Sequence, residues 1–389
     1  SLLYVVPCVT AISCLLAATM VLRLGGGPWA ALVAATVLAL AFPEVFTNSH
    51  PVPGPLGSTL LVGSLLVFVL GDTWRRDEGV DAERPPVLHL LLLLLLFVLA
   101  VTHHMSHFFL LLVLGLAYLL RTALVKGSEL ERDAWGLWSL VAALALASVY
   151  WLAVADTFRE EVMVDLAGLP GAVMMAIAWV ALPLLVVVGV TLRRRRAKVP
   201  SPSFWGPSVL GPYLVLYLAA SLVLLALVSF LGFPGTDIET GPDMLLYTLP
   251  SVALFALVVG STDVLLRRDG GHVVLAWVVA ISGSFLVMVA LQSRVLVPYR
   301  HVPYITEGLA VLAGIGAVHL LIMFKPPDRS WRAFLAPVAV VAVLLAASVA
   351  LTAYPPKGVM GGFQEGTSGS ELGAVFWLRV GLPAPGAAP

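Results

Sequence analysis

Residues 87–121 read VLHLLLLLLLFVLAVTHHMSHFFLLLVLGLAYLLR. Two nearly uninterrupted apolar runs flank a short polar stretch that contains three histidines. Apolar runs of this kind, ended by charges or by Pro and Gly, recur along the 389-residue chain and are typical of membrane-spanning helices. Only 11% of the residues are charged, whereas a soluble domain carries roughly 25%. The sequence therefore predicts an all-α, polytopic transmembrane bundle and excludes a soluble globular protein.

The apolar runs predict about twelve spans. They lie near residues 2–22, 28–42, 55–71, 87–102, 106–121, 136–155, 169–192, 208–232, 244–265, 272–293, 305–324 and 333–353. Residues 28–42 and the two halves of 87–121 are too short to cross about 30 Å upright at about 1.5 Å per residue. We expect these three to be half-helices or re-entrant segments sheltered inside the bundle. The transmembrane domain is predicted to cover residues 1–353, followed by a tail of residues 354–389.

The loop charges predict an orientation. Alternate loops on one side contain 17 of the 22 basic residues. These are Arg23, Arg75, Arg76, Arg84, Arg121, Lys126, Arg132, Arg193 to Arg196, Lys198, Arg267, Arg268, Lys325, Arg329 and Arg332. Because loops rich in Lys and Arg stay in the cytoplasm, we expect this face to be cytoplasmic and both termini to be extracytoplasmic, in a multi-pass protein of the cell membrane. The chain opens within an apolar run, so we also expect an earlier span.

A proline-rich outer loop covers residues 43–55. Four prolines in 13 residues interrupt any continuous helix there. Glu44 and His50 lie in this constrained segment at the predicted membrane surface. They are candidates for a base or a ligand pair at the mouth of a cavity; the alternative is a rigid outer loop without chemistry.

A second constellation, residues 102–109, contains the three histidines of the opening stretch. His103 and His107 are four residues apart and share a face if the segment is helical. Together with His104 they are polar groups beside hydrocarbon, which favours a functional role. The sequence leaves three interpretations open: a polar substrate-binding cavity, a bound metal, or a structural helix tip.

The third constellation is the segment of residues 293–304. Arg294 and Arg300 are two of only five basic residues on the predicted outer face. Tyr299 and Tyr304 flank Arg300, and His301 follows it directly. A planar guanidinium binds phosphate oxygens in pairs, so this segment is predicted to bind a lipid phosphate. The alternative is that these arginines extend to headgroups or pair with Glu307.

The layout resembles the membrane region of the GT-C glycosyltransferases, the superfamily that includes protein mannosyltransferases and oligosaccharyltransferases. The resemblance rests on many spans of uneven length, the proline-rich loop before Leu56-Gly57-Ser58, the polar hairpin tip at 102–107, and Pro298-Tyr299-Arg300-His301 ahead of an apolar span. The segment of residues 370–379 resembles the start of the extracytoplasmic domain that follows the last span in many such enzymes. No single motif in this set is specific.

The resemblance implies a transferase that uses a polyprenyl-phosphate sugar. Arg300, with Arg294, would hold the carrier phosphate, Glu44 or His50 would line the acceptor side, and Tyr299, His301, His103, His104 and His107 would complete the substrate site. These enzymes place an essential Asp or Glu in the first outer loop, which we expect to precede Ser1. The resemblance also implies a divalent cation (Mg or Mn).

Two acidic outer loops offer carboxylates that suit such a cation, although runs of this kind are often solvated loops. They contain Asp156, Glu160, Glu161, Asp165, Asp237, Glu239 and Asp243. Two other functions stay open at this point: a transporter or lipid flippase, and a membrane subunit without chemistry. The expected partners are membrane lipid and a polyprenyl-linked sugar, with no nucleic acid.

Overall fold

The computed structural model describes residues 2–41, 53–78, 83–124, 135–155, 256–261, 264–265, 270–291 and 298–323, with a few isolated positions. Every regular element in these ranges is helical. The eight α-helices described are α1 (Leu2–Arg23), α2 (Gly27–Leu40), α4 (Pro53–Glu78), α5 (Pro86–Thr102), α6 (His104–Leu124), α8 (Trp135–Ala153), α14 (Gly271–Leu291) and α15 (Val302–Met323). Two short 3-10 helices are η1 (Ala256–Ser261) and η2 (Pro298–His301).

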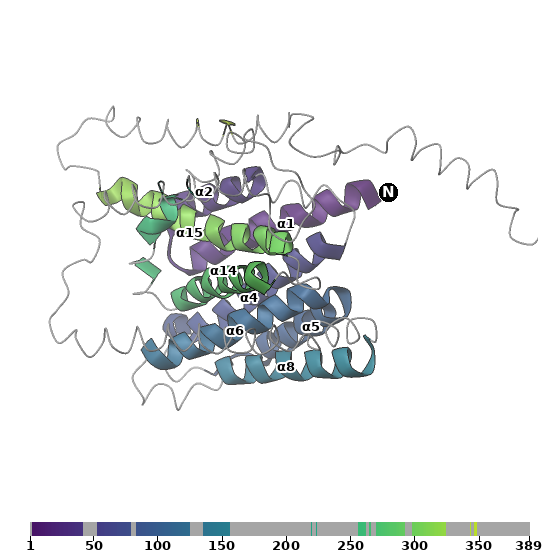
Figure 1. Cartoon of the computed structure of the whole chain (residues 1–389). Helices are drawn as coiled ribbons and strands as arrows, with labels where there is room; N and C mark the ends of the chain where they lie inside the picture. Colours follow the sequence, from purple (N-terminus) through teal and green to yellow (C-terminus); the bar gives the residue numbers. More distant parts are fainter. Residues whose placement is uncertain are drawn as a thin grey trace, which may run out of the picture.

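The helices lie roughly side by side in layers. In Figure 1, α2 is at the top, α1 and α15 lie below it, α14 and α4 form the middle, and α5, α6 and α8 form the bottom. Two glycines of α15 lie close to neighbouring helices. A Cβ on Gly314 of α15 would lie 2.7 Å from Ala34 Cβ in α2, and one on Gly308 would lie 3.3 Å from the Trp277 ring in α14. Glycine at these two positions therefore allows α15 to pack closely against both neighbours.

Local sequence explains where the helices begin and end. The turn between α1 and α2 places Gly25 and Gly27 at φ of 71° and 81°, in the left-handed region that favours glycine. Prolines lie in the first positions of α2 and α5, where a missing backbone N–H removes no helical hydrogen bond. Between α5 and α6 the helical conformation is interrupted at a single residue, His103, whose φ of −153° and ψ of 93° are extended.

Side-chain contacts fix the helix directions and define two ends of the bundle. His107 near the start of α6 contacts Trp151 near the end of α8, so these helices are antiparallel. At the His103 end, α5 finishes and α4, α6 and α15 begin. At the Asp72 end, α4 and α6 finish and α14 begins, because Asp72 pairs with Arg121 and lies 3.9 Å from His272.

Most predicted span boundaries in the described ranges agree with the helices to within a few residues. The short helix predicted at 28–42 is α2, whose 14 residues reach about 21 Å. The prediction that residues 106–121 form a half-helix was wrong, because α6 has 21 residues and continues to Leu124. The proline-rich loop also ends earlier than predicted: α4 begins at Pro53, and Pro53 and Pro55 lie in its first turn, where proline is tolerated.

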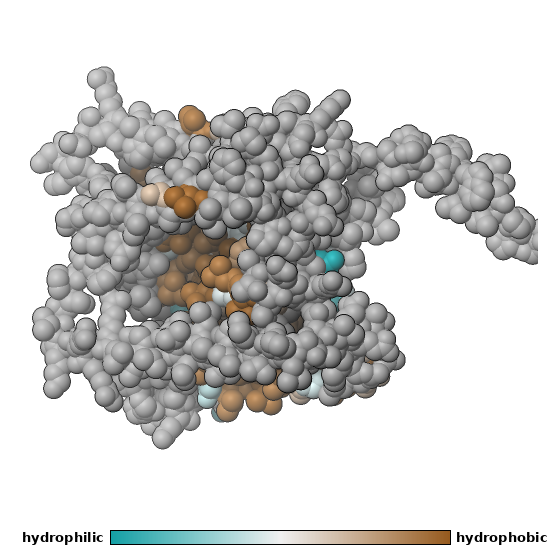
Figure 2. Space-filling view, in the orientation of Figure 1, coloured by the Kyte–Doolittle hydropathy of each residue, from teal (hydrophilic) through white to brown (hydrophobic). Residues whose placement is uncertain are grey.

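Four described helices are long and apolar enough to cross a membrane. Their apolar windows are Gly54–Trp74, His104–Arg121, Gly271–Met288 and Val302–Ile322. Figure 2 shows that the coloured surface on this face is mostly hydrophobic. Residues such as Leu90, Leu94 and Phe97 of α5 and Leu286 of α14 are exposed, as expected for helices that face lipid. The spans predicted near 169–192, 208–232 and 333–353, most of 244–265, and the tail of residues 354–389 lie outside the described residues.

Candidate functional site

His103 caps the first turn of α6. Its Nδ1 accepts a hydrogen bond from the backbone N–H of Ser106 at 3.2 Å, and its carbonyl oxygen accepts one from His107 N–H, also at 3.2 Å. The first N–H groups of a helix have no partner inside the helix, and a side-chain acceptor at the N-cap position satisfies one of them. An imidazole performs this task only if Nδ1 carries no proton. The break between α5 and α6 therefore holds His103 in a defined protonation state and orientation.

Ser106 and Tyr304 extend this contact to α15. Ser106 Oγ lies 2.7 Å from His103 Nδ1 and 2.6 Å from the Tyr304 hydroxyl oxygen, and the Tyr304 oxygen lies 3.5 Å from His103 Nδ1. The Ser106 side chain is fully buried and Tyr304 is nearly so. His103 and Ser106, three positions apart, thus join Tyr304, about 200 positions further along the chain, in one hydrogen-bonded group, which we call the His103 triad.

Helix α4 packs directly against this group through a glycine. A Cβ added to Gly57 would lie 2.5 Å from Ser106 Oγ and 2.7 Å from His103 Cβ. Both separations are far shorter than normal contacts, so only glycine allows α4 to come this close. The Leu56-Gly57-Ser58 segment therefore belongs to the site as the wall behind the triad.

A second polar layer lies beside the triad. The Ser58 hydroxyl of α4 donates to Oε1 of Glu307 in α15, and Ser13 of α1 bonds Thr59 at 2.8 Å. Glu307 is fully buried. Buried polar groups are costly unless they are hydrogen-bonded, so these pairs fix α1, α4 and α15 to one another. The start of α15 is consequently fastened twice: by Tyr304 to α6 and by Glu307 to α4.

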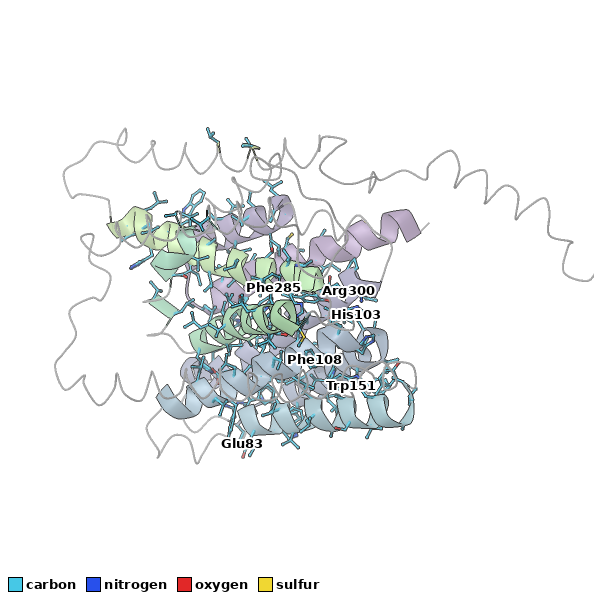
Figure 3. All side chains as sticks on the ribbon, in the orientation of Figure 1. Glu83, His103, Phe108, Trp151, Phe285 and Arg300 are labelled. Atoms are coloured by element: carbon cyan, nitrogen blue, oxygen red, sulfur yellow. The ribbon has the colours of Figure 1, made fainter. Side chains whose placement is uncertain are left out.

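Arg300 and His301 precede α15 in η2. Arg300 is exposed, whereas His301 is fully buried, with its Nε2 at 3.0 Å from Ser284 Oγ and its ring centroid 4.6 Å from that of Phe109. Figure 3 shows Arg300 and His103 beside each other at the His103 end, with Glu83 towards the other end of the bundle. The buried neighbour anchors the short helix, and Arg300 presents a guanidinium next to the triad.

The environment of His103 disfavours its charged form. Burial, then the neighbouring His104 and then the Arg300 charge lower the pKa of His103 from 6.5 to about 4. His103 lies between α5 and α6, outside the apolar windows. Because its pKa lies well below physiological pH, His103 is neutral, as its cap hydrogen bond also requires. It contributes no positive charge to the site.

The other two histidines of the predicted cluster lie differently. His107 is fully buried and its Nε2 bonds the Ala143 carbonyl oxygen of α8 at 2.9 Å. Because His103 is extended and not helical, the condition under which the two side chains would share a helix face is not met. His104 is half-buried and stacks on His103 with ring centroids 5.9 Å apart. The two rings that lie together are thus His103 and His104.

The remaining predicted site residues lie outside what the structure describes. Glu44, His50 and Arg294 fall in undescribed ranges, and only the backbone of Tyr299 is described. Within the described part of the chain, no three His, Cys, Asp or Glu side chains come close enough together to hold a metal ion. The expected divalent cation therefore has no ligand set among these residues, and the acidic outer loops also lie beyond them.

Three residues of the site were not predicted as site residues: Ser106, Gly57 and Ser58. Ser106 follows His103 by three positions, which is the spacing of an N-cap and its N3 residue. Tyr304 follows Arg300 by four positions, about one helical turn. These local spacings can be recognised in the sequence, but the contact between α6 and α15 across 198 positions cannot.

Comparison with known proteins gives a fold. No family model matches the chain, and no curated protein matches it. Among solved structures, the chain is similar to the archaeal oligosaccharyltransferase AglB from Archaeoglobus fulgidus in complex with an inhibitory peptide and a dolichol-phosphate, with a TM-score of 0.56, 12% identity and coverage of 98% of this chain and 47% of that one. It is also similar to an Archaeoglobus fulgidus oligosaccharyltransferase in the apo form, with a TM-score of 0.50, 14% identity and coverage of 99% and 49%.

These similarities define the class of fold. Four of the described helices are long and apolar enough to cross a membrane, and the fold of the chain is similar to that of the two oligosaccharyltransferase structures. The chain spans about half the length of the oligosaccharyltransferase structures that it matches. At this level of identity the match concerns the fold, and the chemistry depends on the site itself.

Proposed function

We propose that this chain is the membrane region of a GT-C-type glycosyltransferase that moves a sugar from a polyprenyl-phosphate carrier to an acceptor on the extracytoplasmic face. The observation that carries the proposal is the exposed Arg300 guanidinium at the His103 end, beside two stacked imidazoles and above a buried hydrogen-bonded framework. The similar AglB structure contains a dolichol-phosphate, a lipid of the same chemical class as the proposed carrier.

The physical logic starts from the lipid. A polyprenyl chain stays in the bilayer, so its phosphate is met at the end of the helices by a fixed cation. A guanidinium binds two phosphate oxygens with parallel hydrogen bonds, and Arg300 supplies one on a short helix that His301 anchors. We assign Arg294 and Tyr299 to the same phosphate site, and His103 and His104 to its wall. His301 and His107, which are buried, support the site from behind.

The reaction breaks the bond between the anomeric carbon of the sugar and the phosphate oxygen. It forms a bond from that carbon to an acceptor oxygen or nitrogen, and the electron pair of the broken bond stays on the lipid phosphate. Arg300 would stabilise the negative charge that develops there. The acceptor loses a proton, and we assign its removal to Glu44, with His50 as the other candidate. A cation such as Mg or Mn would take its ligands from residues outside the described ranges.

Binding of a short carrier analogue tests the phosphate site. The full chain is reconstituted in nanodiscs, and the Kd for farnesyl phosphate is measured for the native protein, Arg300→Ala and Arg300→Lys. We expect Arg300→Ala to weaken binding at least about tenfold, and Arg300→Lys to weaken it less, since charge remains without the planar fork. Arg23→Ala removes an exposed cation from the Asp72 end and is the matched control, which should bind normally.

Unchanged binding by Arg300→Ala would contradict the proposal. A second arm measures transfer of radiolabelled sugar from polyprenyl-phosphate donors to a peptide or sugar acceptor, in parallel with movement of the labelled lipid between leaflets. Transfer without leaflet movement supports the transferase. Leaflet movement without transfer would support a flippase instead.

A further inference from the structure

The hydrogen bonds of the His103 triad have a fixed direction. A backbone N–H can only donate, so Ser106 N–H makes His103 Nδ1 an acceptor. Ser106 Oγ lies 2.7 Å from the same nitrogen, and at that distance an oxygen lone pair facing the Nδ1 lone pair would be repulsive. The Ser106 hydroxyl therefore donates to Nδ1. It accepts in turn from the Tyr304 hydroxyl at 2.6 Å.

This direction determines which nitrogen of His103 carries the proton. A neutral imidazole has one N–H, and when Nδ1 accepts, the proton is on Nε2. The start of α6 reinforces this state, because the positive end of the helix dipole disfavours an imidazolium at the N-cap. His103 is therefore a neutral donor.

We propose that Tyr304 and Ser106 are positioning residues that hold His103 as a neutral Nε2–H donor beside Arg300, so that the site binds a phosphate oxyanion with one guanidinium and one imidazole N–H. This inference rests on the proposed function for the identity of the anion. It adds the donor-to-acceptor direction of the hydrogen bonds in the triad and the role of each of its three residues. Tyr304 lies four residues after Arg300, so the residue that orients the imidazole also fixes the short helix that carries the guanidinium.

Two substitutions at position 103 separate the donor role from the structural role. His103→Asn keeps an acceptor near the Nδ1 position and is a good N-cap, but it loses the distant N–H. His103→Gln places an amide N–H near the Nε2 position and loses the cap. If the donor role is right, His103→Gln binds farnesyl phosphate with nearly native affinity and a lower Tm, whereas His103→Asn keeps the Tm and loses about tenfold in affinity. The reverse order of affinities would overturn the inference.

A spectroscopic measurement tests the positioning residues without depending on any substrate. Nitrogen-15 NMR of the histidine-labelled protein in bilayers, with the His103 signals assigned by their loss in His103→Gln, should show a neutral ring protonated at Nε2. Ser106→Ala and Tyr304→Phe should shift the Nδ1 signal, with the larger change in Ser106→Ala, because the hydroxyl hydrogen bond to Nδ1 is lost or weakened while the Ser106 backbone N–H still keeps the proton on Nε2. Thr306→Ala is the matched control, because the Thr306 hydroxyl bonds the Val302 carbonyl within its own helix at 2.9 Å.

Failure of this inference and failure of the proposed phosphate site at Arg300 give different results. A native His103 ring protonated at Nδ1, or signals that do not respond to Ser106→Ala, overturns the inference even when Arg300→Ala abolishes binding. If the tautomer is as expected and His103→Asn and His103→Gln differ as stated, but Arg300→Ala binds normally, the proposed role of Arg300 fails while the donor role of His103 stands.

Discussion

The two ends of the bundle are stabilised by different chemistry. At the Asp72 end, the Asp72 carboxylate pairs with Arg121, and His272 Nε2 lies 3.9 Å from the same carboxylate. At the His103 end, neutral hydrogen bonds join His103, Ser106 and Tyr304. Each end connects α6 to another helix, but one connection is charged and the other is not.

The arginines at the two ends, Arg121 and Arg300, have different environments. Arg121 is mostly buried and its charge is taken up by Asp72, whose side chain is 3% exposed. Arg300 is exposed beside a histidine that the fold keeps neutral. A buried ion pair holds helices together, whereas an exposed cation beside the uncharged His103 triad can attract an anion. The comparison predicts that substitutions at the Asp72 end change stability and that substitutions at the His103 end also change binding.

The largest effect is expected from Asp72→Asn. The amide keeps the size of the carboxylate but leaves the Arg121 guanidinium buried without its opposite charge, which costs about 3–5 kcal/mol. The free energy of unfolding in bicelles measures the loss, with Arg23→Gln as an exposed control. The double variant Asp72→Leu/Arg121→Leu should recover most of the stability, because neither buried charge remains. If the double variant is less stable than Asp72→Asn, the pair is not the source of the effect.

Gly57→Ala should have the next largest effect, at the other end. The new methyl group would collide with Ser106 Oγ and His103 Cβ, and overpacking of this kind costs about 1–3 kcal/mol. Because it displaces the triad, it should also weaken farnesyl phosphate binding. The control is Gly115→Ala in α6, where nothing lies within 4 Å of the added Cβ. Gly115→Ala should be neutral or slightly stabilising, since alanine favours helix more than glycine does. Equal Tm values for the two variants would contradict the packing seen at Gly57.

The helix boundaries show what the sequence could and could not predict. Helix boundaries follow from hydropathy, and the predicted spans 2–22 and 272–293 correspond to Leu2–Arg23 and Gly271–Leu291. The ends of α4 and α6 were placed too early: α4 continues through a polar segment to Glu78, and α6 continues past Arg121 to Leu124. Hydropathy indicates where the apolar run ends, but the helix that contains the run can continue beyond that residue.

The site was predicted in its composition and missed in its connections. The sequence singled out His103 and Arg300, because polar residues on an apolar helix tip are unusual. It did not reveal that Tyr304 bonds Ser106 or that Glu307 bonds Ser58, since both are long-range contacts between helices. The suggestion that His103 and His107 act together assumed a continuous helix, and one extended residue turned His107 towards α8.

A smaller effect is expected from Ser284→Ala. The Ser284 hydroxyl bonds His301 Nε2 at 3.0 Å in a fully buried setting, and loss of one such hydrogen bond costs about 1–1.5 kcal/mol. The matched control is Ser139→Ala, which removes a buried hydroxyl that bonds the Trp135 carbonyl within its own helix at 2.7 Å. Thermal unfolding of the two variants measures the difference. If Ser139→Ala is equally destabilised, the His301 contact does not anchor η2 in particular.

The smallest effect is a pH dependence that comes from His103 alone. Its pKa is about 4 in the folded protein and about 6.5 in the unfolded chain, so the unfolded chain binds more protons between these values. The free energy of unfolding should therefore fall as the pH is lowered through 6.5 towards 4, and the loss between pH 7.5 and 5.5 is on the order of 1 kcal/mol. Unfolding in bicelles over this pH range, compared between the native protein and His103→Asn, isolates this contribution from the other histidines. The native protein should lose more stability on acidification than the variant does. Equal pH dependences would mean that His103 is not held neutral, and the contrast between a charged end and a neutral end would then fail at the residue on which it depends most.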